Sequence, residues 1–144
     1  MTTLYRTDFY VWTQRQADLL RNEDYADLDL PNLIEEIESL GASARRELKS
    51  RLRTILTHML KLLCEPTAQP SAQWRGTIRT QRNDLADLLD ENFTLQSTVG
   101  DFIEAAYAKA VEDAADGTKC DAVDFPATCP WTTVQILDKA FLPA

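Results

Sequence analysis

The strongest constraint on the fold is an apolar ladder in the middle of the chain. It consists of Leu48, Leu52, Ile55, Met59 and Leu62. Their steps of four, three, four and three residues place them on one face of an α-helix, which has 3.6 residues per turn. A half-buried β-strand would instead carry apolar residues at every second position. The ladder therefore predicts a long amphipathic helix at the centre of the fold, ending before Pro66.

Two shorter helices are predicted before the ladder. The first, over 8–22, starts on an aspartate, which is a good N-cap residue. The second, over 31–40, starts on a proline that suits a first turn, and it is followed by Gly41, which suits the position after a helix end. The helix that carries the ladder is then expected to start at Ser43.

Helical periodicity continues after the ladder. A fourth helix is indicated by Trp74, Ile78, Gln81, Leu85 and Leu88, a fifth by Ile103, Tyr107, Ala110 and Ala114, and a last short helix is expected from Thr132 to about Lys139. The sequence has no alternating Val/Ile/Thr run and no Asn-Gly or Asp-Gly turn. We therefore predict an all-α helical bundle of four main helices plus short terminal helices, forming a single helical domain over residues 1–144.

Length and composition narrow the class of protein further. The chain has 144 residues with 15 Lys+Arg and 23 Asp+Glu, which gives a net charge of −8 and argues against general nucleic-acid binding. It contains no apolar run long enough to span a membrane and no signal-peptide pattern at its start. Its three cysteines are widely separated and form no C-x-x-C pair, so we expect neither a disulfide framework nor a zinc site. These features favour a cytoplasmic protein.

Four sequence segments, taken in order, resemble a known bacterial family. They begin as Asp8-Phe-Tyr-Val-Trp, Leu28-Asp-Leu-Pro, Trp74-Arg-Gly-Thr-Ile-Arg and Phe125-Pro-Ala-Thr-Cys-Pro-Trp. Together they resemble the domain-of-unknown-function family DUF29 over nearly the whole chain. The resemblance implies a small all-helical cytoplasmic protein, of a kind common in cyanobacteria and proteobacteria, and it implies no established activity.

His58 is the chain's one histidine and the first candidate for chemistry near neutral pH. The spacing of Arg51 and His58 resembles the Arg-φ-x4–6-His motif of HEPN ribonucleases, in which the histidine would act as acid/base and the arginine would neutralise phosphate. Both lie on one edge of the ladder helix, about 10 Å apart along its axis. They would therefore need a two-fold partner to converge. Arg53 fits a shorter spacing but points away from His58. The structural alternative is a histidine hydrogen-bonded within the fold.

A carboxylate metal site is a second possibility that the sequence disfavours. Glu35, Glu36 and Glu38 lie close in sequence, but their positions on a helix point in different directions. The facing Glu-x-x-His pairs of a di-iron bundle are missing. We predict no metal site and no cofactor, and interpret Glu35 as a solvated residue that favours the helix start.

Trp74, Arg75 and Arg82 define a basic edge on the fourth predicted helix. One interpretation is an anion or phosphate site with the Trp74 ring as a stacking wall. The favoured interpretation is structural, with the arginines pairing with glutamates across helices. It predicts that Arg75 or Arg82 bonds a glutamate within residues 35–38.

No converging catalytic set emerges from these patterns. The favoured function is therefore a small helical interaction or adaptor protein, with a protein partner or as a homodimer, and no membrane association. The first alternative is a metal-independent HEPN-like ribonuclease using His58 with Arg51, which is the one reading that involves nucleic acid. The weaker alternative is an anion-binding module at Trp74, Arg75 and Arg82.

Overall fold

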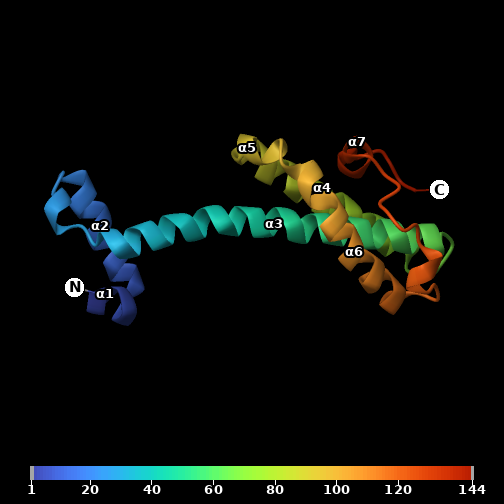
Figure 1. Cartoon of the computed structure of the whole chain (residues 1–144), viewed down its shortest axis with the longest axis horizontal. Helices are drawn as coiled ribbons and strands as arrows, with labels where there is room; N and C mark the ends of the chain where they lie inside the picture. Colours follow the sequence, from blue (N-terminus) through green and yellow to red (C-terminus); the bar gives the residue numbers. More distant parts are fainter. Residues whose placement is uncertain (1, 144) are drawn as a thin grey trace. The chain divides into compact units, whose positions relative to one another are not determined.

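The structure is a computed structural model that describes residues 2–143, and all regular elements in that range are helical (Figure 1). They are α1 (Thr2–Thr7), α2 (Phe9–Arg21), η1 (Tyr25–Asp27), α3 (Leu30–Cys64), α4 (Ser71–Glu91), α5 (Phe93–Gln96), α6 (Val99–Gly117), η2 (Ala122–Asp124) and α7 (Thr133–Leu137). The predicted all-α class, with four main helices, is confirmed.

The chain divides into two compact units, Met1–Ser43 and Ala44–Ala144, each described below by itself. We call them the N-terminal unit and the C-terminal unit. Residues of each unit contact mainly other residues of the same unit. The assignment of one domain to residues 1–144 stays a prediction.

The N-terminal unit is built around the inner face of α2. Asp8 is the predicted N-cap, and its carboxylate accepts a hydrogen bond of 3.1 Å from the backbone N–H of Val11. Trp12 and Gln16 are buried on the next turns. The Trp12 indole donates to the Asp29 carboxylate at 3.0 Å, and the Gln16 side-chain carbonyl accepts from the Asp29 backbone N–H at 2.8 Å. These two bonds hold Asp29, the residue that precedes α3, against α2.

The predicted helix end at Gly41 is wrong, because α3 continues through it from Leu30 to Cys64. A glycine terminates a helix by adopting a left-handed conformation, and no glycine in the described chain has a positive φ. A glycine inside a helix costs about 1 kcal/mol relative to alanine, which a helix of this length tolerates. The two helices expected over 31–40 and from Ser43 are therefore one.

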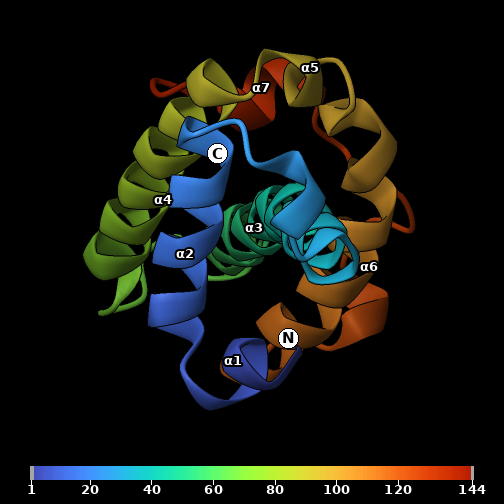
Figure 2. The same cartoon turned by 90° about the vertical axis from the view of Figure 1, so that its left-hand side faces the viewer.

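The C-terminal unit packs its other helices around the ladder of α3. All five ladder residues are buried. Viewed along α3, α4 and α6 lie on opposite sides of it (Figure 2). The core is completed by apolar side chains from both helices: Trp74, Ile78, Leu85, Leu88, Ile103, Ala106, Tyr107, Ala110 and Ala114. The periodicities predicted for α4 and α6 are thus the faces that these helices bury.

Arg82 joins α4 to the C-terminal segment from within the core. Its side chain is 3% exposed. Nε donates to the Ile136 carbonyl at 2.8 Å, Nη1 to the Phe141 carbonyl at 2.7 Å, and Nη2 to the Gln135 carbonyl at 3.2 Å. Burial lowers the pKa of Arg82, while the carboxylate of Asp138 acts in the opposite direction. The guanidinium thus satisfies carbonyl groups at the end of α7, a favourable place for a cation.

The expected bond to a glutamate within residues 35–38 is therefore wrong for Arg82. All three nitrogens of Arg82 bond carbonyl groups instead. Arg75 forms no hydrogen bond or ion pair within the described residues. A buried arginine can be satisfied by backbone as well as by carboxylate, and α7 supplies that backbone.

The expectation that the cysteines form no disulfide framework is also wrong. Cys64, the last residue of α3, forms a disulfide with Cys120, with 6.3 Å between the Cα atoms. The two residues are 56 positions apart, so sequence spacing gave no sign of the pairing. Cys129 is free and half-buried. The bond ties the end of α3 to the chain that follows α6.

Candidate functional site

An apolar face on the first turns of α3 is the most unusual surface of the N-terminal unit. Ile34, Ile37 and Leu40 are 54%, 65% and 72% exposed. At 100° per residue they share one side of the helix. We call these three residues the apolar face. Isolated exposed leucines are ordinary, whereas three large side chains aligned on one helix face mark an interaction site.

Carboxylates outnumber cations in the N-terminal unit, and two of them lie beside the apolar face. Residues 1–43 contain nine carboxylates and three arginines. Glu36 and Glu38 flank the face on its two sides, whereas Glu35 points nearly away from it. Glu35 and Glu38 form no hydrogen bond or ion pair within the described chain. Glu36 accepts a hydrogen bond from the Tyr5 hydroxyl, which raises the pKa of Tyr5 to about 12. The surface therefore combines an apolar centre with an acidic border.

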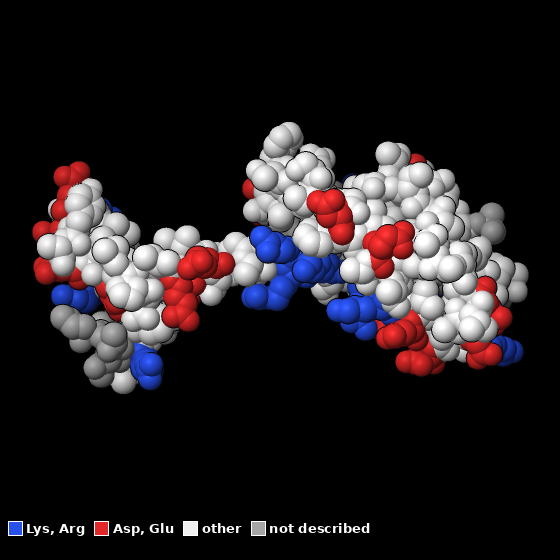
Figure 3. Space-filling model, in the orientation of Figure 1, with Lys and Arg blue, Asp and Glu red and all other residues white. Residues whose placement is uncertain are grey.

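The C-terminal unit carries a contrasting basic surface on its own part of α3. Arg45, Arg46, Lys49 and Arg53 follow one another there, and Figure 3 shows blue Lys and Arg atoms gathered on this stretch. We call residues 45–53 the basic segment. Arg45 and Arg46 are exposed and, within residues 2–143, form no ion pair. Sequence reasoning missed this surface, although Arg45, Lys49 and Arg53 recur every four residues.

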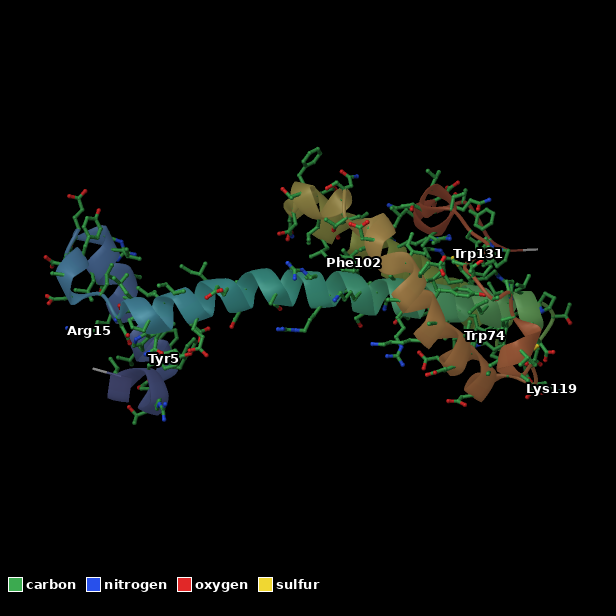
Figure 4. The ribbon with its side chains drawn as sticks, viewed as in Figure 1. Tyr5, Arg15, Trp74, Phe102, Lys119 and Trp131 are labelled. Atoms are coloured by element: carbon green, nitrogen blue, oxygen red, sulfur yellow. A yellow bond between two sulfur atoms is a disulfide. The ribbon has the colours of Figure 1, made fainter. Side chains whose placement is uncertain are left out.

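A pocket of about 280 Å³ opens beside the basic segment. It is lined by Lys49, Ser50, Arg53, Phe102, Ala105, Ala106 and Lys109. The ammonium of Lys49 lies 4.8 Å from the ring centroid of Phe102, within the range of a cation–π contact. Figure 4 labels Phe102 in this unit. Arg53 donates two hydrogen bonds to the Asp113 carboxylate, at 2.6 and 2.8 Å, and thereby lowers the pKa of Asp113. Lys49 and Lys109 form no ion pair within the described residues.

The structure does not bring Arg51 into contact with His58. Arg51 donates to Gln81 at 3.0 Å and to the carboxylates of Asp84 and Glu47, each at 3.3 Å. The Nδ1 of His58 donates to the backbone carbonyl of Thr54, at 2.8 Å. These contacts give both residues structural partners. The ribonuclease alternative stays a prediction to which the geometry adds no support.

We expect His58 to make folding stability depend on pH. Burial, helped by the charge of Lys61, lowers the pKa of His58 below its ordinary value of 6.5 in the folded state. The unfolded state therefore binds the proton more readily, and stability falls as pH drops through the ordinary pKa towards the folded one. Urea unfolding from about pH 8 to about pH 5 should show this loss, and His58→Gln should remove that part of it. If the free energy of unfolding falls equally with pH in the wild type and in His58→Gln, His58 is not the source of the pH dependence.

The other predicted site residues lie within the core of the C-terminal unit or at its edge. Trp74 is buried, with the Lys61 ammonium 5.7 Å from its ring centroid. Arg82 bonds the carbonyl groups described above, and Arg75 is half-buried. The three do not form one open anion site. Within residues 2–143, no group of three or more His, Cys, Asp or Glu side chains is arranged to hold a metal ion.

These elements define an all-α protein with an exposed apolar face and a separate basic surface. In the described chain, no helix is both long and apolar enough to cross a membrane. The chain belongs to the family described as Domain of unknown function DUF29, whose model matches residues 4–142. The resemblance to that family is thereby confirmed.

A solved structure shares this fold. It is the crystal structure of an alpha-helical protein of unknown function from Rhodospirillum rubrum, with 28% sequence identity and a TM-score of 0.65. The match covers 95% of this chain and 90% of that one. No curated protein matches the sequence. The comparisons thus establish family and fold, and the function of the protein is not established by them.

Proposed function

We propose that the protein is a helical interaction module of the bacterial cytoplasm that acts as a homodimer held through the apolar face of α3. The observation that carries this proposal is the exposure of Ile34, Ile37 and Leu40 on one side of a regular helix. Covering the three side chains would remove a large apolar area from water, at roughly 25 cal/mol per Å².

Other apolar side chains of the same unit extend the surface that a partner could use. Leu30 precedes the apolar face by about one turn and is also more than half exposed. On α2, Tyr10 and Leu20 are exposed as well. Helix faces of this kind bind a second helix through residues at i, i+3 and i+7. A second copy presents such a helix without any further component.

Replacing Ile37 with aspartate tests the proposal. We expect the wild-type protein to sediment as a dimer at micromolar concentration, and Ile37→Asp to raise the dissociation constant at least about tenfold, since a buried charge is strongly unfavourable at an apolar contact. Ser39→Asp is the matched control, because it adds the same charge on the opposite side of the helix. A wild-type protein that stays monomeric, or equal behaviour of the two variants, would overturn the proposal.

A further inference from the structure

We propose that the pocket between α3 and α6 binds a phosphate monoester whose organic group is small and apolar. Every residue that lines this pocket belongs to the C-terminal unit. The apolar face of the proposed dimer belongs to the N-terminal unit, so binding in the pocket does not depend on dimerisation. Three features carry the assignment: the space that small residues leave, the charge of the lining side chains and the hydrogen-bond donors that they present.

Small residues explain why a pocket forms between α3 and α6. Ser50 of α3 and Ala105 and Ala106 of α6 line it, and their side chains are too short to fill the space between two packed helices. The pocket has a volume of about 280 Å³. This volume is just below the range of about 300 to 1,000 Å³ that is typical of drug-sized ligands. The ligand is therefore a small compound, with room for about one ring and one charged group.

Two contacts between α3 and α6 hold the walls of the pocket. Arg53 donates from Nε and Nη2 to the two oxygens of Asp113, at 2.6 and 2.8 Å, and such a two-point bond fixes the orientation of both side chains. The ammonium of Lys49 lies 4.8 Å from the centroid of the Phe102 ring. Both contacts cross from one helix to the other. The pocket therefore exists before a ligand binds, which lowers the entropic cost of binding.

All charged side chains that line the pocket are cations, although the chain as a whole has 23 Asp+Glu and only 15 Lys+Arg. They are Lys49, Arg53 and Lys109. Asp113 neutralises Arg53, and Glu112 adds negative charge near that arginine. Lys49 and Lys109 form no ion pair within the described residues. The two lysines are therefore the groups that attract an anion to this pocket.

The donors of the pocket match a phosphate dianion. Each lysine ammonium has three N–H donors and no acceptor. The Ser50 hydroxyl also lines the pocket and forms no hydrogen bond to another described residue. A phosphate monoester carries a charge of about −1.5 to −2 at pH 7 and three acceptor oxygens, which suit two ammonium groups and a hydroxyl. A carboxylate brings one negative charge and would leave one lysine without a partner.

The apolar part of the lining selects an ester over free phosphate. Phe102, Ala105 and Ala106 present an aromatic ring and methyl groups to the pocket. An organic group that covers these side chains removes apolar surface from water, which favours binding. Inorganic phosphate has no such group and gains only the electrostatic contacts. We therefore expect affinity to require both parts of the ligand.

Titration calorimetry of the full chain with phenyl phosphate at pH 8 tests the proposal. Phenyl phosphate combines one ring with a dianion, whereas inorganic phosphate has no ring and benzyl alcohol has no charge. We expect phenyl phosphate to bind with a dissociation constant below about 1 mM, and at least about tenfold more tightly than either of the other compounds. Failure of either expectation would overturn the assignment.

Two double variants show whether the ligand binds at the lysines of the pocket. Lys49→Gln with Lys109→Gln should weaken phenyl phosphate binding at least about tenfold. Arg79→Gln with Lys139→Gln is the matched control, because it removes the same charge from residues outside the pocket, and it should change the affinity by less than about twofold. All four side chains are exposed, so circular dichroism can confirm folding before titration. Equal losses in the two variants would mean general attraction of anions and would overturn the site.

Ala105→Leu tests the apolar part of the pocket without changing its charge. Ala105 is exposed, and leucine is also a good helix former, so the variant should fold. The larger side chain fills the pocket and should weaken phenyl phosphate at least about tenfold, while inorganic phosphate binds as before. Unchanged binding of phenyl phosphate would place its ring elsewhere and contradict the proposal. A monomeric wild type would overturn the proposed dimer and leave this site standing, because each titration measures ligand binding alone.

Discussion

Replacing Arg82 with methionine is expected to destabilise the C-terminal unit by about 3 to 5 kcal/mol. The substitution leaves three carbonyl groups without their donor, and each unpaired buried polar group costs about 1 to 3 kcal/mol. Methionine keeps much of the side-chain volume but has no donor. The carbonyl groups of Gln135, Ile136 and Phe141 would lose their partner where water reaches them poorly. Urea unfolding measures the loss as a lower midpoint with an unchanged slope.

Arg79→Met is the matched control for this prediction. Arg79 lies one turn before Arg82 on α4, is exposed, and forms no hydrogen bond or ion pair in the part of the chain that the structure describes. Its replacement should change stability by less than about 0.5 kcal/mol. Arg82→Lys should give an intermediate loss, because one ammonium cannot replace a planar fork that reaches three carbonyl groups. Equal stabilities for Arg82→Met and Arg79→Met would show that the arginine does not hold the C-terminal segment.

Opening the Cys64–Cys120 disulfide is expected to cost about 4 kcal/mol, the stabilisation that the chain-entropy model gives for a loop of this length. The bond joins residues 56 positions apart, so the reduced unfolded chain gains considerable freedom. Cys120→Ser should lower the free energy of unfolding by about this amount under oxidising conditions. The measurement is urea unfolding with and without dithiothreitol.

The reductant distinguishes the disulfide from other effects of the substitution. Dithiothreitol should lower the stability of the wild type to that of Cys120→Ser and leave the variant unchanged. Cys129→Ser controls for loss of a thiol, because Cys129 is free and should leave the effect of dithiothreitol intact. Three reactive thiols per chain in the folded, oxidised wild type would contradict the bond.

The sequence predicted those parts of the fold that depend on local periodicity. The ladder of α3 and the apolar repeats of α4 and α6 became buried faces because a helix fixes which residues share a side. Asp8 and Thr132 became N-caps because capping requires only nearby backbone. Gly41 failed as a helix end because the stop depends on the conformation that the glycine adopts.

The features that sequence reasoning missed depend on contacts between distant residues. Arg82 binds carbonyl groups more than fifty positions away. Every residue has a backbone carbonyl, so the sequence does not show which of them accepts a hydrogen bond. The partner of Cys64 depends on where the turn after α6 runs. Periodicity alone places Ile37 on an apolar face, but it does not say whether another element of the same chain covers that face. The exposure of Ile37 therefore had to come from the structure.

The contacts of Arg82 also bear on how this protein can change over evolutionary time. Hydrogen bonds from an arginine to backbone carbonyl oxygens do not depend on which side chains the accepting residues carry. Substitutions at Gln135 and Phe141 can therefore leave these hydrogen bonds intact, whereas an inserted or deleted residue between them would move an acceptor out of reach. Selection on this segment would preserve its length and path more strictly than its composition.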